Sequence, residues 1–411
     1  MPTMTAFSTM TRRALPTAAI ALVAILGGCD LKVTNPGPLL DENLNSASAV
    51  PALVNGMGGD LSLAIGNYLT RGSLAALELR HSGNFAAERK FAAGDIGPED
   101  VNGDWARMHT ARYVAEAGLE RMKTVLGTAF ETNANTPRAY LYAGFANRFL
   151  GENVCNAVFD GGPALPSSTH FVRAESLFTR ALTIARALNN TALTNAALAG
   201  RAQVYANQGK WTEAAADAAL VPVAFRHNAV FSLNTTRENM DLANQTITRR
   251  EVTVWNTVWV ADRDPRVLYD TVKTGTTITK GQDGATNFFR QRKYLTLGDP
   301  VALARGTEML LIRAEAALRA SDLTNAMLFI NQGRTAASLT PLTPLTPLTA
   351  TTIGDAYVHL MRERGAVLWL ESRRLFDLRR WLAEGRNTTR QGRSPERAFR
   401  SASKNVAPTP T

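Results

Sequence analysis

The sequence predicts a mostly α-helical protein, in which a tetratricopeptide-like repeat scaffold packs against an irregular half with a few short strands. Three observations support this fold class: apolar residues at helical spacing, a helix-pair pattern that occurs twice, and one β-branched, aromatic stretch between the two copies. The chain has 411 residues, of which 45% are hydrophobic and 19% charged. That composition is ordinary for a globular protein, and the length suffices for one large body, which we place over residues 47–385.

The first residues have the pattern of an export signal. Arg12 and Arg13 precede an apolar run over residues 14–26, which is short for a membrane span. A basic segment followed by a short apolar one is typical of a secretory signal peptide, here residues 1–28. The run ends in Leu26-Gly27-Gly28-Cys29, which resembles the bacterial lipobox, whose cysteine becomes the first mature residue and carries acyl chains.

We therefore expect lipidation at Cys29 and a lipidated tether over residues 29–46. Several acyl chains hold a protein durably on a membrane, whereas one does not. An ordinary signal peptide with an incidental cysteine is the alternative. Asp30, a residue that favours inner-membrane retention in some bacteria, leaves the choice of membrane open at this point.

Helical spacing dominates the next part of the chain. Glycines at positions 56, 58, 59 and 66 suggest helices with breaks over residues 47–80. Trp105 follows a polar loop, and we expect it to open a helix. One face of that helix carries apolar and small residues three or four positions apart: Met108, Ala111, Val114, Ala115, Gly118, Leu119 and Met122. Further helices are predicted over residues 139–150, 173–188, 196–208 and 212–220.

The last two of these helices have a counterpart later in the chain. Five positions recur after 112 residues, namely Leu198, Ala202, Gly209, Trp211 and Ala214, as Leu310, Ala314, Ser321, Leu323 and Ala326. In both copies two helices meet at a short polar turn, residues 208–210 and 320–322. Neither pair can bury its apolar face alone, so we expect repeat pairs within 105–222 and 305–381 to stack.

Residues 225–300 form a predicted irregular insertion between the two copies. Residues 252–255 and 258–260 have strand-like composition, and residues 274–280 are rich in β-branched residues and glycine. The Thr-Pro-Leu repeat over residues 340–349 excludes helix and predicts an exposed loop. A last long helix is expected over residues 353–381.

The chain is basic, and much of the excess charge lies at its end. The formal charge is +10, and removing Arg12 and Arg13 with the leader lowers it to +8. Residues 386–404 carry six basic side chains against Glu396. We interpret residues 386–411 as a basic flexible tail, with a binding arm as the alternative. A basic balance could also indicate nucleic acid or an anionic membrane surface; we expect no nucleic-acid partner.

Motifs for catalysis are missing from the sequence. The five histidines contain no pair at zinc-protease spacing, and neither a nucleophile elbow nor a phosphate-binding glycine loop occurs. Asp262 and Asp264 could form an acid/base pair or a calcium site, but Arg263 and Arg266 beside them favour ion pairing. Cys155 has no partner if Cys29 is acylated, and we expect it to be buried. We therefore predict no enzyme activity, no cofactor and no metal.

Aromatic residues are the best candidates for ligand contact. Flat rings stack on the apolar faces of sugars, while neighbouring polar groups bind the hydroxyls; an aromatic residue is nevertheless more often part of the core. We select six candidates, with Trp105 and Trp259 preferred for their polar surroundings: Trp105, Trp255, Trp259, Tyr269, Phe288 and Tyr294.

The run over residues 363–381 carries the most specific pattern. Glu371 with Arg374, and Asp377 with Arg373 and Arg380, stand at spacings where opposite charges meet on a helix. The run resembles the C-terminal signature of the SusD/RagB-like family. It departs from that signature at two positions, where Val367 replaces an acid and Ser372 replaces a glycine. The matching residues are Glu363, Arg364, Leu368, Glu371, Arg374, Asp377, Leu378 and Arg380.

Other segments resemble the same family in the same order along the chain. They are the mature start at Cys29-Asp30-Leu31 with Val33-Thr34-Asn35-Pro36, the turn at Asp264-Pro265-Arg266, and residues 311–316 with Asn331 and Arg334. The resemblance implies a repeat scaffold beside a ligand-binding half, without catalytic residues. It further implies a lipid-anchored lid on a TonB-dependent, SusC-like barrel at the cell surface of the outer membrane, which imports oligosaccharides or peptides.

From this we expect a surface lipoprotein that binds a nutrient, most plausibly an oligosaccharide, and delivers it to the transporter. Two alternatives remain: a surface glycan hydrolase or peptidase whose site has no familiar motif, and a repeat scaffold of the cell envelope that binds no ligand. Turnover of an oligosaccharide would favour the first alternative. Failure to bind any glycan or peptide, without a barrel partner, would favour the second.

Overall fold

The computed structural model describes residues 41–336 and 345–386. The signal peptide, Cys29, the tether up to residue 40, residues 340–344 of the Thr-Pro-Leu repeat and the tail from residue 387 lie outside the described residues. The chain divides into two compact units, Met1–Leu44 and Asn45–Thr411. Of the first unit only a 3-10 turn, Asp41–Leu44, is described. All that follows concerns the second unit.

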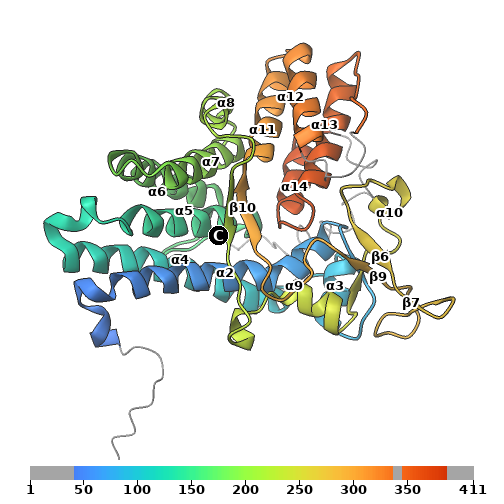
Figure 1. The fold of residues 1–411 in the computed structure, drawn as a ribbon, viewed down its shortest axis with the longest axis horizontal. Helices are drawn as coiled ribbons and strands as arrows, with labels where there is room; N and C mark the ends of the chain where they lie inside the picture. The colour runs from blue at the N-terminus through green and yellow to red at the C-terminus, as the bar shows by residue number, and fades with distance from the viewer. Residues whose placement is uncertain (1–40, 337–344, 387–411) are drawn as a thin grey trace, which may run out of the picture. The chain divides into compact units, whose positions relative to one another are not determined.

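The second unit is built mainly of helices that pack against their neighbours in chain order. α4 packs on α5, α5 on α6, α6 on α7 and α7 on α8, after which the chain leaves the scaffold and returns with α11 beside α8 (Figure 1). The predicted fold class is confirmed. The helices are α2 (Val50–Ala75), α4 (Pro98–Leu126), α5 (Thr136–Asn153), α6 (Ser168–Ala187), α7 (Thr191–Asn207), α8 (Trp211–Ala219), α11 (Gly306–Arg319), α12 (Leu323–Ala336), α13 (Ile353–Val367) and α14 (Arg374–Ala383).

The two copies of the repeat are neighbours in space although 112 residues separate them in the chain. Gly209 and Ser321 occupy the same position of the two turns, and both have left-handed backbone, with φ of 77° and 60°. The helix pairs α7–α8 and α11–α12 stack through α8 and α11. Trp211 at the start of α8 lies under the guanidinium of Arg319, 4.2 Å from the ring centroid. The turn geometry is therefore repeated even where the sequence replaces glycine with serine.

The expectation of broken helices over residues 47–80 was wrong, because α2 runs unbroken for 26 residues. Two of its glycines allow close packing instead of ending the helix. A Cβ atom at Gly58 would come within 2.8 Å of the Tyr142 ring, and one at Gly66 within 2.6 Å of the Phe231 ring. Pro51 occupies the first turn, where its missing N–H costs no helical hydrogen bond.

The predicted single helix over residues 353–381 is also corrected. α13 ends at Val367 and α14 begins at Arg374. Leu370 and Ser372 in the turn between them have left-handed φ values of 56°. The backbone N–H of Leu370 donates to the buried Glu78 carboxylate, 3.1 Å away. The break therefore lets the C-terminal segment satisfy a buried charge on another part of the body.

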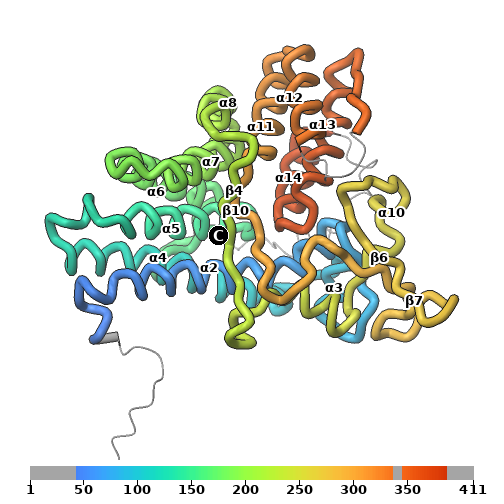
Figure 2. The backbone as a smooth tube through the Cα atoms, in the orientation of Figure 1, coloured from blue at the N-terminus to red at the C-terminus, as the bar shows by residue number. Residues whose placement is uncertain are grey.

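The irregular half contains short antiparallel strand pairs. β4 (Arg226–Ala229) and β10 (Val301–Arg305) join the two halves of the repeat scaffold (Figure 2). The other pairs are β1 (Arg80–His81) with β5 (Val252–Thr253), β2 (Asn156–Ala157) with β3 (Leu165–Pro166), β6 (Tyr269–Thr271) with β9 (Phe289–Gln291), and β7 (Lys273–Thr274) with β8 (Thr277–Ile278). Short helices α3 (Ala86–Ala93), α9 (Asp241–Ala243) and α10 (Val258–Asp262) connect them.

The strand-like segment over residues 258–260 is thus helical, against expectation. Its β-branched residues suit a strand, but the short turn of α10 places the Trp259 ring in the protein core. A large core spans α2, α4 to α7 and β10, and a smaller one lies among α11, α12, α13 and Trp381. Within the described ranges, none of the helices has both the length and the hydrophobicity needed to traverse a bilayer.

Candidate functional site

Three of the six predicted ligand-contacting aromatics belong to the core, which corrects their assignment. Trp259, Phe288 and Tyr294 are only 1–2% exposed. The Arg374 guanidinium covers the Trp259 ring at 5.0 Å, and a Cβ at Gly365 would come within 2.8 Å of the same ring. The Tyr294 hydroxyl donates to the carbonyl of Leu370. These rings have no face free for a ligand.

Two of the remaining candidates, Trp255 and Tyr269, lie on one part of the irregular half. Trp255 follows β5 and is half-buried, and Tyr269 on β6 stacks parallel to Phe289 on β9, with ring centroids 5.6 Å apart. The N–H of Val254 donates to the carbonyl of Phe289, which joins β5 to β9. We call Trp255, Tyr269 and Phe289 the aromatic lobe; β6 and β9 lie beside α10 and β7 in Figure 1.

The aromatic lobe also carries charged side chains suited to hydroxyl groups. Asp270, next to Tyr269, pairs with Arg290 at 2.9 Å and with Arg292 at 3.5 Å. All three side chains are partly exposed, although the Nε atom of Arg290 is buried without a hydrogen-bond partner in the structure. Because successive residues of a strand point to opposite faces, this charged cluster lies on the face of β6 and β9 opposite to the Tyr269 and Phe289 rings.

Trp105 lies on a different surface, on α4. It stands in the second turn of the helix, not at its start, because α4 already begins at Pro98. Its side chain is 44% exposed and its ring tilts over His109, with centroids 4.2 Å apart. His109 in turn meets His170 of α6 at 6.0 Å. We call Trp105, His109 and His170 the histidine patch.

Both histidines of the patch are held neutral. Burial, helped by the charge of Arg112, lowers the pKa of His109 to about 4. Burial and the neighbouring His109 lower the pKa of His170 to about 3. The Nδ1 atom of His170 lies 3.0 Å from the Asn147 amide oxygen, whereas the Nε2 atoms of both rings are buried without a hydrogen-bond partner in the structure.

A pocket of about 570 Å³ was not predicted from the sequence. It lies where the first half of α2, the first turns of α5, β4 and the loop after β4 meet. The only sequence feature that marks this pocket is the glycine-rich stretch of α2, which we interpreted as helix breaks. Its polar lining side chains are Asn55, Asp60, Ser62, Arg138, Tyr142, Asn228, Ser232, Arg237 and Glu238.

One wall of this pocket carries an ion pair. Arg237 reaches Asp60 at 2.8 Å. Burial raises the pKa of Asp60, although the charge of Arg237 opposes that shift. The pocket lies within the size range of small-ligand sites, roughly 300–1,000 Å³.

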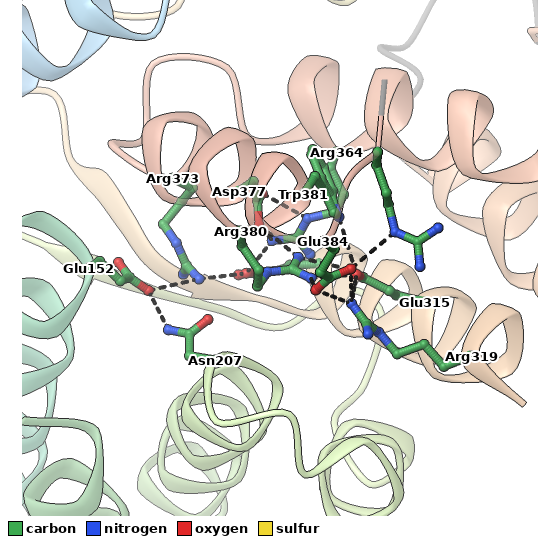
Figure 3. Close-up of polar contacts among 12 residues, drawn as sticks. Glu152, Asn207, Glu315, Arg319, Arg364, Arg373, Asp377, Arg380, Trp381 and Glu384 are labelled. Carbon is green, nitrogen blue, oxygen red and sulfur yellow. Dashed lines mark hydrogen bonds and ion pairs between the residues drawn. The ribbon is translucent and has the colours of Figure 1, made fainter. Parts of the chain in front are cut away.

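The charged residues of the C-terminal signature form an interior network, not a ligand site (Figure 3). Glu315 on α11 accepts hydrogen bonds from Arg380, Arg319 and the Trp381 indole, at 2.5, 3.1 and 3.2 Å. Arg364 on α13 reaches Asp377 at 2.8 Å. Each of these charges is balanced by another within the fold, so the network joins α11, α13 and α14.

Some predicted partners within the signature were wrong. Asp377 pairs with Arg380 at 3.2 Å as expected. Arg373 instead reaches Glu152 of α5 and Glu308 of α11, at 3.1 and 3.2 Å.

Glu371 pairs with Lys293 at 2.6 Å and with Arg305, both of which lie outside the signature. The helical spacing rule fails because the helix breaks between residues 367 and 374.

The remaining predictions about charges and thiols have mixed outcomes. Asp264 pairs with Arg266 at 2.8 Å, as expected, and Arg266 also binds Glu363 of α13. Cys155 is exposed, which corrects the expectation of a buried thiol, because it precedes the edge strand β2. Among the described residues, no group of three or more histidine, cysteine, aspartate or glutamate side chains could hold a metal ion.

Comparison with known proteins supports the resemblance predicted from the sequence. Residues 207–408 match the sequence model of the SusD family, and no curated protein sequence matches the chain. A SusD-like carbohydrate binding protein from Bacteroides vulgatus is 16% identical with a TM-score of 0.61, covering 81% of this chain and 83% of its own. A SusD/RagB family protein from Bacteroides thetaiotaomicron is 11% identical with a TM-score of 0.61, covering 85% and 89%.

A third solved structure, surface glycan-binding protein A from Bacteroides thetaiotaomicron, is 12% identical with a TM-score of 0.62, and the match covers 89% of this chain and 99% of that one. These structural matches extend the likeness beyond the segment that the family sequence model covers. The SusD family model matches just under half of the chain, and the solved structures show that this chain has the fold of SusD-like proteins.

Proposed function

We propose that this protein is a lipid-anchored, cell-surface lipoprotein that binds oligosaccharides without cleaving them and delivers them to a TonB-dependent transporter of the outer membrane. The observation that carries the proposal is the aromatic lobe, where the partly exposed rings of Trp255, Tyr269 and Phe289 offer stacking faces on a SusD-like fold. Two of the similar structures are named as carbohydrate- or glycan-binding proteins, which supports a sugar ligand.

Ligand binding is tested by calorimetric titration of the mature protein with a panel of oligosaccharides and peptides. We expect an oligosaccharide to bind, and Trp255→Ala or Tyr269→Ala to weaken binding by about 1–3 kcal/mol, because each removes a stacking face. Tyr113→Ala is the matched control, since Tyr113 is an aromatic residue of α4 with 59% exposure. Binding of peptides alone, or release of cleaved sugar, would contradict the proposal.

Anchoring and delivery are tested in cells of a native host. Cys29→Ala should release the protein from the membrane fraction, because the acyl chains would attach at that thiol. The acylated protein should co-purify with a large outer-membrane barrel, and its loss should slow uptake of the bound oligosaccharide. Normal uptake in its absence would contradict the delivery role while leaving sugar binding intact.

A further inference from the structure

We propose that the pocket between α2, α5 and β4 is a second binding site, and that it takes a sugar residue carrying a carboxylate, with Arg138 as the partner of that carboxylate. This inference rests on the proposed function, because it assumes that the ligands are glycans. It assigns a ligand class to a pocket whose lining residues include none of the aromatic lobe.

Arg138 is the cation of this pocket that lacks an acidic partner. Its guanidinium donates to the amide oxygen of Asn55 at 3.2 Å, to the Tyr142 hydroxyl at 3.3 Å and to the amide oxygen of Asn135 at 3.5 Å. All three acceptors are neutral. Within residues 41–336 and 345–386, no carboxylate forms an ion pair with it, whereas Arg237 on the other wall has Asp60.

The position of Arg138 strengthens its attraction for an anion. It stands in the first turn of α5, which begins at Thr136, so the positive end of the helix dipole adds to its charge. Burial and then the charge of Arg138 lower the pKa of His227 to about 4, so this imidazole is neutral and adds no second positive charge. A guanidinium matches a carboxylate with two parallel hydrogen bonds, which a single hydroxyl cannot provide.

The α2 wall leaves room for a ring next to this guanidinium. A Cβ atom added at Gly56 or Gly59 would meet nothing within 4 Å. Gly58 between them is the contact point for the Tyr142 ring, which holds Tyr142 and its bonded Arg138 in place. The bare stretch of helix therefore exposes backbone at the pocket surface, where a ligand can approach closely.

The opposite wall provides partners for hydroxyl groups. The Asp60–Arg237 pair and the Glu238 carboxylate, which accepts a hydrogen bond from the Ser232 hydroxyl, line it together with Asn228. The amide oxygen of Asn228 accepts no hydrogen bond in the structure. The pocket thus combines one cation without a carboxylate partner with an ion pair, a hydrogen-bonded carboxylate and an amide oxygen without a donor. These groups match the one carboxylate and several hydroxyls of a uronic acid.

The test is calorimetric titration of the mature protein with glucuronate and galacturonate, each beside its neutral parent, glucose or galactose. We expect the acidic sugars to bind at least about tenfold more tightly than the neutral ones, and more weakly as salt rises. Arg138→Gln should weaken the binding of the acidic sugars at least about tenfold. Arg107→Gln, which alters an exposed arginine of α4, is the matched control and should change nothing.

Equal affinity for acidic and neutral sugars would overturn the inference, as would unchanged affinity in a folded Arg138→Gln variant. Arg138→Lys, which keeps the charge but loses the planar fork, should retain part of the preference and shows that the site tolerates substitution. Oligosaccharide binding that depends on Trp255 but shows no acidic preference would contradict this inference alone. Absence of all glycan binding would contradict the proposed function.

Discussion

The interior network of α11, α13 and α14 and the histidine patch of α4 and α6 bury ionisable groups in opposite ways. In the network, Glu315 stays charged: burial alone would raise its pKa, but the charges of Arg380, Arg364 and Arg319 lower it to about 2. In the histidine patch no carboxylate compensates, so His170 is neutral. In both regions desolvation disfavours the charged form. A group with an oppositely charged partner stays ionised, and a group without one is neutral.

The two regions also differ in whether their polar groups are already paired within the fold or could bind a ligand. The network pairs each of its charged side chains with an opposite charge inside the fold, although the Nε atom of Arg319 is buried without a hydrogen-bond partner in the structure. In the patch, the Nε2 atoms of the two histidines have no hydrogen-bond partner in the structure. In the pocket, the guanidinium of Arg138 donates only to neutral acceptors. Ligand binding is therefore expected away from the C-terminal signature, although that signature carries the resemblance to the family.

The largest effect is expected from breaking the network. Glu315→Ala leaves Arg380 and the Trp381 indole without their acceptor in the interior, so the free energy of unfolding should fall by about 3–5 kcal/mol. Urea denaturation followed by circular dichroism measures it. The control is Glu120→Ala, which removes an exposed pair with Lys123 and should cost less than about 1 kcal/mol. Equal losses would show that the network is not interior in solution.

A smaller effect is expected from acid at the histidine patch. The unfolded state binds a proton at His170 below pH 6.5, whereas the folded state does so only near pH 3, so folding stability present above pH 6.5 is lost as the pH falls. At pH 5 this loss amounts to about 2 kcal/mol for His170. His170→Gln should flatten the stability profile between pH 7 and 5, measured by urea denaturation. A profile as steep as the wild type would contradict a buried neutral imidazole.

The opposite pH dependence is expected where the C-terminal turn meets Glu78. Burial raises the pKa of Glu78 to about 7, although the charge of Arg374 opposes the shift. Stability from this group is therefore complete below pH 4.5 and lost as the pH rises through 7.

Glu78→Gln keeps an acceptor for Leu370 and should remove about 2–3 kcal/mol of that dependence between pH 5 and 8. The measurement is thermal unfolding at fixed ionic strength. An unchanged slope would exclude Glu78 as its source.

The smallest effects are expected in the two repeat turns. Gly209→Ala should destabilise by about 1 kcal/mol, because its φ of 77° is unfavourable for a residue with a Cβ atom. Ser321→Gly at φ 60° should be neutral or stabilise by about 0.5–1 kcal/mol for the same reason. Thermal melts of both variants, compared with the double variant, test whether the turns are equivalent.

Several sequence predictions failed for one reason: they assigned exposure from local pattern. Trp259 follows strand-like residues beside a charged turn, yet α10 directs its ring against Gly365 and Arg374. Trp105 has a similar polar setting and is exposed. The sequence around Trp259 and Trp105 does not show which ring is buried. That depends on Gly365, more than 100 positions after Trp259, which leaves space for the Trp259 ring.

The sequence by itself determined the helical scaffold, the duplicated turn and the family resemblance, because helical spacing and a contiguous signature are properties of neighbouring residues. Only the tertiary structure decided which charges pair, which aromatic rings are free and where the pocket lies. Those features bring together segments such as α2, α5 and β4, whose residues are 80 to 170 positions apart in the chain. Burial and pairing depend on such long-range contacts, which no local pattern of residues contains.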